Sequence, residues 1–139
     1  MHKKKKTKIL ILGGSGFIGY HLSKKCITKG WDVTSISKNY PKKIKFVSKV
    51  NYKNINLENF KNLSILEKNY DYIVNASGYI NNNDKLNYKN HNFKIVKNIF
   101  LYFKNTNIKA FLNLGTSAEY GGIKSLQNEN LICRPKSKY

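Results

Sequence analysis

The stretch Lys8-Ile-Leu-Ile-Leu12, followed at once by Gly13-Gly-Ser-Gly16-Phe-Ile-Gly19, decides how this chain folds. The apolar run has the length of a buried strand, and residues 17–29 carry the apolar positions of a helix that Gly30 ends. Between strand and helix, glycines recur at every third residue. This order of strand, glycine-rich turn and helix predicts that the turn binds the pyrophosphate of a dinucleotide.

Each glycine of this turn has an expected role. Gly13 permits the tight turn, Gly16 lets the backbone approach the pyrophosphate, and Gly19 allows the helix to pack close to the sheet. Free N–H groups and the positive end of the helix dipole then bind the phosphates. The alternative is an ordinary tight turn that binds nothing. The cofactor contacts predicted here are Gly13, Ser15, Gly16, Phe17, Ile18 and Gly19.

Downstream, short apolar runs alternate with segments of helical periodicity. Strands are expected at 32–37, 71–75 and 109–114, and the stretch 42–56 could hold one or two more. Helices are expected at 57–69 and at 84–105, the second with an apolar stripe of Phe93, Val96, Phe100 and Phe103. This alternation predicts the α/β class, a parallel sheet with right-handed crossovers. We expect a basic tail over residues 1–7 and one domain over residues 8–139.

The charge of the chain is strongly positive but its composition argues against a specific nucleic-acid partner. The 139 residues include 26 basic and 7 acidic side chains, a formal net charge of +19. Only Arg134 is an Arg, whereas nucleic-acid readers use its planar fork for phosphate and guanine. The lysines are also spread through the whole chain. They indicate a solvated surface, with a polyanion site at Lys3–Lys6 as the alternative.

The cysteines, the histidines and the N-terminus further limit the classes of protein that fit this sequence. Cys26 and Cys133 lie far apart and match no metal-binding spacing, so free thiols in a reducing compartment are expected. The three His are scattered, and no metal site is predicted. The apolar run Ile9–Leu12 is too short for a signal core or a membrane span. We expect a cytoplasmic protein with no membrane partner.

The glycine spacing and the following run Gly16-Phe-Ile-Gly-Tyr-His-Leu22 resemble the extended short-chain dehydrogenase/reductase family. These are NAD(P)-dependent epimerases, dehydratases and reductases of nucleotide sugars. The resemblance implies a Rossmann-type doubly wound parallel sheet and a nucleotide-sugar substrate, and full-length members are often homodimers. It also implies cofactor contacts near the adenine and beside the sugar and pyrophosphate, at Asn56, Leu57, Ala76, Ser77 and Gly78.

The end of the second expected strand bears on the choice between NAD and NADP. A carboxylate there would bind the ribose 2′-OH of NAD, but the strand ends in Ser37, Lys38 and Asn39. A hydroxyl and an ammonium group suit a 2′-phosphate better. We therefore expect Ser37 and Lys38 to contact the cofactor and favour NADP modestly over NAD. Alternatively, Lys38 is simply one of many surface lysines.

The segment Leu112-Asn-Leu-Gly-Thr116-Ser-Ala-Glu-Tyr120-Gly121 resembles the family's motif at the end of the fifth strand. The resemblance makes Thr116 the residue that hydrogen-bonds the reacting sugar hydroxyl; a Thr that merely caps its loop is the alternative. Dehydratases often have acidic residues at the next two positions. Here they are Ser117 and Ala118, which favours an epimerase or a keto-sugar reductase.

By the same resemblance, Tyr139 stands at the catalytic Tyr of the family's Tyr-x-x-x-Lys motif, 23 residues after Thr116. The Lys would follow one helical turn later, and the sequence ends at residue 139. A phenol, with a reference pKa of about 10, needs such a cation to act as a base near neutral pH. We expect a truncated chain, without the C-terminal substrate region, that is weakly active or inactive. A non-catalytic dinucleotide-binding module is the alternative function.

Overall fold

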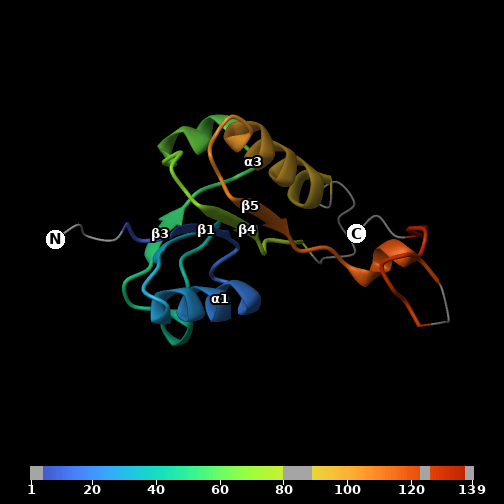
Figure 1. The fold of residues 1–139 in the computed structure, drawn as a ribbon, viewed down its shortest axis with the longest axis horizontal. Coiled ribbons are helices and arrows are strands. Elements are labelled where there is room, and N and C mark those ends of the chain that lie inside the picture. The colour runs from blue at the N-terminus through green and yellow to red at the C-terminus, as the bar shows by residue number, and fades with distance from the viewer. Residues whose placement is uncertain (1–4, 80–88, 123–125, 137–139) are drawn as a thin grey trace.

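The computed structural model describes residues 5–79, 89–122 and 126–136 (Figure 1). Within these residues, five parallel strands form one sheet in the order β3-β2-β1-β4-β5. The strands are β1 (Lys8–Leu12), β2 (Asp32–Ser37), β3 (Asn51–Asn54), β4 (Tyr72–Asn75) and β5 (Ala110–Asn113). The chain winds outward from β1 in both directions. The predicted α/β class, a Rossmann-type doubly wound sheet, is therefore confirmed.

In the described part of the chain, α1 (Phe17–Thr28) and α3 (Ile95–Phe103) cover opposite faces of the sheet, as Figure 1 shows. Ile9 and Ile11 of β1 pack in the core cluster on the α1 side. Leu10 and Leu12 pack in the cluster on the α3 side. A strand buried on both faces needs an apolar residue at every position. This explains the continuous apolar run of β1, whose predicted bounds are correct at both ends.

Asp71 ties three strands together at their amino ends. Its Oδ2 accepts a hydrogen bond from the backbone N–H of Lys8 at 2.8 Å. Its Oδ1 lies 3.0 Å from Nζ of Lys109, next to β5. These contacts lower the pKa of Asp71, and the backbone hydrogen bond from Lys8 has the largest effect. The ionised carboxylate therefore links β1, β4 and β5.

The helix predicted over residues 57–69 is wrong: only a short 3₁₀ helix, Phe60–Ile65, forms there. Leu63 and Leu66 are buried, whereas Phe60 is 46% exposed. A constant spacing of three residues follows the 3₁₀ period and drifts away from one face of an α-helix. The ambiguous stretch 42–56 contains a single strand, β3, preceded by a short 3₁₀ helix over Lys43–Lys45.

The helix predicted over residues 84–105 is shorter in the described part of the chain. α3 begins at Ile95, after a π-helical turn over Lys89–Lys94, and residues 84–88 lie outside the described residues. The predicted stripe is wrong at Phe93 and Phe100, which are 60% and 59% exposed. The buried residues of α3 instead follow the 3.6-residue period; they are Ile95, Asn98, Ile99 and Phe103.

Three further features bear on the sequence-based expectations. None of the helices in residues 5–79, 89–122 and 126–136 has the length and apolar character that crossing a membrane requires. The same residues hold no group of three or more His, Cys, Asp or Glu side chains arranged to bind a metal ion. Both cysteines are free thiols, Cys26 buried and Cys133 exposed.

Candidate functional site

A cleft of about 630 Å³ lies at the carboxyl ends of the strands, where the strand order reverses beside β1. Its volume falls within the roughly 300–1,000 Å³ range of small-molecule sites. Ligands of open α/β sheets bind at this reversal of strand order. Most of the predicted cofactor contacts line the cleft, namely Gly13, Ser15, Gly16, Ser37, Lys38, Asn56, Leu57, Ala76, Ser77 and Gly78.

The glycine turn brings backbone against backbone beside the cleft. Gly13 has a φ of +77°, and a Cβ there would lie 2.7 Å from the carbonyl oxygen of Ala76. The tight turn predicted at Gly13 is therefore present. A Cβ on Gly19 would overlap the backbone of Gly13 and Gly14. Gly19 thus lets α1 start directly against the turn.

The N-terminus of α1 is suited to an anion. Gly16 is its N-cap and supplies no side chain, and the first turn of the helix contains no acidic residue. Four amides of the turn are used internally. The N–H groups of Gly13 and Gly14 donate to the Ile36 carbonyl, that of Ser15 to Ser37 Oγ, and that of Gly16 to the Gly13 carbonyl. The first N–H groups of a helix have no intrahelical acceptor and carry the positive dipole end. Three predicted contacts outside the cleft lining supply these amides, namely Phe17, Ile18 and Gly19.

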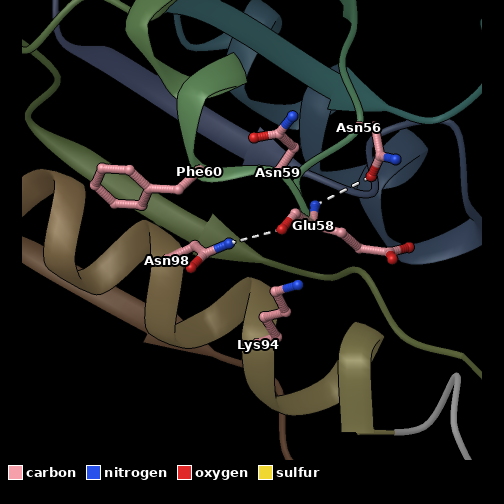
Figure 2. A pocket seen from close by; sticks show the side chains of 6 residues that line it. All are labelled: Asn56, Glu58, Asn59, Phe60, Lys94 and Asn98. Atoms are coloured by element: carbon pink, nitrogen blue, oxygen red, sulfur yellow. Dashed lines mark hydrogen bonds between the residues drawn. The ribbon is translucent and has the colours of Figure 1, made fainter.

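The segment that follows β3 forms one wall of the cleft. Asn56 Oδ1 accepts a hydrogen bond from the N–H of Glu58 at 3.1 Å. Nδ2 of Asn98, on α3, donates to the carbonyl oxygens of Leu57 and Glu58 at 3.2 Å each. Figure 2 shows Asn56 and Asn98 reaching Glu58 from opposite sides. Glu58 Oε1 also lies 3.2 Å from Nε2 of His91.

Part of this wall was not predicted from the sequence. His91 stacks on Tyr79 with ring centroids 4.9 Å apart, and both line the cleft. Asn98 is 8% exposed on an apolar helix face, and a polar residue at such a position is the one signal that the sequence offered. The cleft-lining residues absent from the prediction are Ile36, Asn39, Ile55, Glu58, Tyr79, His91 and Ile95.

Thr116 lies in a smaller pocket of about 180 Å³ that shares Ser77 and Gly78 with the cleft. Thr116 Oγ1 accepts a hydrogen bond from the N–H of Ala118 at 3.2 Å and so caps the 3₁₀ helix Ser117–Tyr120. Thr116 therefore caps this 3₁₀ helix, which was the alternative role, and it also lines the pocket. The described residues that line this pocket include no group that titrates near neutral pH; they are Asn75, Ser77, Gly78, Asn92, Asn113, Leu114, Gly115 and Thr116.

An amide network fixes the backbone between the two cavities. Nδ2 of Asn75 donates to Oδ1 of Asn113 at 2.7 Å and so joins the carboxyl ends of β4 and β5. Oδ1 of Asn75 accepts from both the N–H and the hydroxyl of Ser77. Asn92 binds the backbone N–H and carbonyl of Tyr79 at 3.1 and 3.4 Å. The chain after β4 is therefore held by the side-chain amides of Asn75, at the end of β4, and of Asn92.

Two tyrosines bear on the expected catalytic base. Tyr139, the expected catalytic phenol, lies outside the described residues, and its role stays a prediction. Tyr120 follows Thr116 closely, and its pKa is raised, first by loss of hydration and then by the charge of Glu119. Tyr120 therefore remains protonated near neutral pH and is poorly suited to act as a base.

Several solved structures with this fold are nucleotide-sugar epimerases. UDP-galactose 4-epimerase is 18% identical with a TM-score of 0.86, over 96% of this chain and 46% of its own. The UDP-Glc/GlcNAc 4-epimerase of Campylobacter jejuni is 22% identical with a TM-score of 0.86, over 96% and 44%. UDP-glucuronic acid 4-epimerase of Bacillus cereus, in complex with NAD, is 21% identical with a TM-score of 0.80, over 96% and 48%.

These similarities show a shared fold, and the chain spans less than half the length of each of these proteins. No curated protein matches the sequence. The model of one protein family, described as the NAD dependent epimerase/dehydratase family, matches residues 9–139. That match begins inside β1 and includes the glycine turn, the cleft and the Thr116 pocket. The chain belongs to the NAD-dependent epimerase/dehydratase family.

Proposed function

We propose that the cleft binds a nicotinamide dinucleotide whose pyrophosphate lies at the N-terminus of α1. The observation that carries this proposal is the glycine turn: it borders a cleft of about 630 Å³ at the point where the strand order reverses. Close backbone contacts at Gly13 exclude side chains there, and α1 starts with uncapped amides. The family itself is NAD dependent, and the Bacillus cereus structure contains NAD.

The two halves of the dinucleotide would then occupy different ends of the cleft. The end of the second strand contacts the adenosine ribose in folds of this type. The adenosine would therefore lie toward Ser37, Lys38 and the segment after β3. The nicotinamide would lie toward Ser77 and Gly78, next to the Thr116 pocket. When bound, the nicotinamide supplies hydride transfer, and the chain's own residues orient the substrate.

The reaction best supported is hydride exchange on a nucleotide sugar, as an epimerase or a keto-sugar reductase. UDP-sugars are the substrates named for the similar structures. In this assignment Thr116 hydrogen-bonds the reacting hydroxyl and Tyr139 accepts its proton. Ser117 and Ala118 bring no acid to the pocket, which favours these reactions over dehydration.

The test is a calorimetric titration of the 139-residue chain with NAD and NADP, compared with a Gly16→Asp variant. Gly16 has an ordinary φ of −74° and Asp is a favourable N-cap, but a Cβ there would lie 3.1 Å from the carbonyl oxygen of Gly13, so the turn must shift slightly. The Asp carboxylate would occupy the anion site, so we expect at least a tenfold loss of affinity, and thermal melting establishes that the variant is folded. Equal affinity in both proteins, or no binding by either, contradicts the proposal.

The same titration tests the choice of cofactor. Lys38 lines the cleft and is exposed, and we propose that it favours the 2′-phosphate of NADP. Lys38→Glu should then reverse the preference toward NAD. Lys42→Glu changes the net charge equally from an exposed position outside the cleft lining, and it should leave the ratio of the two affinities unchanged.

A non-catalytic dinucleotide-binding module is the second candidate. It is favoured by the absence of a group that titrates near neutral pH among the described residues of the Thr116 pocket. The two functions differ in turnover. Conversion of a UDP-hexose by the chain with NAD, lost in Tyr139→Phe, supports the enzyme, whereas binding of the dinucleotide without conversion supports the module.

A further inference from the structure

The wall segment, Asn56–Asn59, has a cavity on each side. One is the cleft, and the other is a hollow of about 360 Å³. Figure 2 shows the hollow, lined by Asn56, Glu58, Asn59, Phe60, Lys94 and Asn98. Asn56 and Glu58 border both spaces. Packing alone therefore does not fix the backbone of this segment, and hydrogen bonds must contribute to its position.

Buried apolar side chains anchor the wall segment on one side, since its Leu57 is 5% exposed and Ile55, directly before it, is 4% exposed. The carbonyl groups need separate partners, because a buried carbonyl without a hydrogen bond is costly. Both hydrogens of the Asn98 amide are used here, on Leu57 and Glu58. The Asn56 carbonyl accepts from Nδ2 of Asn62 at 3.0 Å.

Asn98 is a polar residue in apolar surroundings. Its neighbours on the buried face of α3 are Ile95, Ile99 and Phe103, and it is itself 8% exposed. An amide on such a face is unfavourable unless it is hydrogen-bonded. Its Nδ2 hydrogen bonds go to the segment that forms the wall of the cleft, not to its own helix.

We propose that Asn98 is a positioning residue for the adenosine half of the dinucleotide, acting through the wall segment. This inference rests on the proposed cofactor site. Asn98 does not line the cleft, so it acts by holding the backbone of Leu57 and Glu58 where the adenosine contacts it. The contact between Glu58 and His91 fastens the same segment to the turn that precedes α3.

The experiment compares Asn98→Leu with Ile99→Val by calorimetric titration with NAD and with ADP. Leu removes the amide donor and suits a buried helix face, so this variant is expected to fold. Ile99→Val shortens the next residue of the same buried face without removing any hydrogen bond to the wall segment. Thermal melting establishes a temperature at which the parent and both variants are folded.

We expect Asn98→Leu to weaken ADP and NAD by the same factor, about tenfold, because both ligands contain the adenosine. Ile99→Val should lower thermal stability and leave both affinities within about twofold. Unchanged affinity in Asn98→Leu, or an equal loss in Ile99→Val, overturns the inference and leaves the cofactor site standing. Failure of the parent chain to bind either ligand instead contradicts the proposed function.

Discussion

The glycine turn and the Thr116 pocket lie at the same edge of the sheet, but their surroundings differ. The turn is surrounded by backbone, and a Cβ on Gly14 would overlap the side chain of Ser35. Thr116 follows the edge strand β5, where Leu112 and Leu114 are 54% and 38% exposed. Under the proposed function, the turn belongs to a cofactor half that is close-packed, and the Thr116 pocket to a reacting half that rests on few contacts. Binding and chemistry should therefore respond separately to mutation.

The largest effect is expected from Gly13→Ala. The added Cβ would meet the backbone of Ala76 and Ser77 at 2.7 Å, and its φ of +77° is itself unfavourable for Ala. We expect a loss of roughly 3 kcal/mol or more in the free energy of unfolding, since strain and steric overlap add. Chemical denaturation measures the loss, and titration should show no dinucleotide binding.

Gly30→Ala is the matched control for this prediction. Gly30 has a φ of +74°, but nothing lies within 4 Å of the added Cβ. It should therefore show the conformational cost alone, about 1 kcal/mol, and keep its affinity for the dinucleotide. Equal losses in the two variants would mean that the close packing of the turn contributes nothing.

Thr116→Val should have a smaller effect that stays in the reacting half. It removes the hydroxyl that accepts from Ala118, so we expect a loss of about 1 kcal/mol in local stability. Hydrogen exchange at Ala118 should become faster, while the affinity for NAD changes by less than about twofold. Thr106→Val, three residues after the end of α3, is the control for replacing a Thr by Val outside both cavities. A tenfold loss of NAD affinity in Thr116→Val would remove the distinction between the halves.

The smallest effect is expected at Asp71, which ties β5 to the better-packed strands. Its pKa in the folded chain lies below the reference value of 3.8. A lowered pKa means that the carboxylate stabilises the fold above the unfolded pKa, and that this contribution is lost as the pH falls through the folded value. Asp71→Asn should therefore lower the melting temperature near pH 7, and the difference from the parent should shrink as the pH falls below 3.8. A difference that stays the same over this whole pH range would show that the charge is unimportant.

Local sequence signals predicted the parts of the fold that depend on neighbours along the chain. β1, α1 and the turn at Gly13 need only an apolar run, a glycine pattern and a helical period. The face of α3 could not be predicted in this way, because the large Phe93 and Phe100 outweigh Ile95 and Ile99 in any apolar pattern. The buried face of α3 is the one that packs against the sheet, and an apolar pattern alone does not define which side of the helix that is.

The residues of the candidate site also divide into those that local motifs predict and those that depend on distant contacts. Turn residues such as Ser15 follow from one motif, and Ser37 and Ser77 follow from strand ends that a parallel sheet brings to one edge. Asn98 and Glu58 act across 40 positions of sequence, through an amide and a carbonyl that no spacing rule connects. Contacts of this kind arise only once the helix has docked on the sheet.

The hydrogen bonds of Asn75 have a consequence for Ser77, which lines both the cleft and the Thr116 pocket. Its carboxamide oxygen carries no hydrogen, so the hydroxyl proton of Ser77 must point toward it. The lone pairs of Ser77 Oγ are then left for a ligand, and this hydroxyl acts as an acceptor only. A ribose or sugar hydroxyl can donate to it, but a phosphate oxygen cannot. One asparagine thus makes this hydroxyl selective for hydrogen-bond donors over phosphate oxygens.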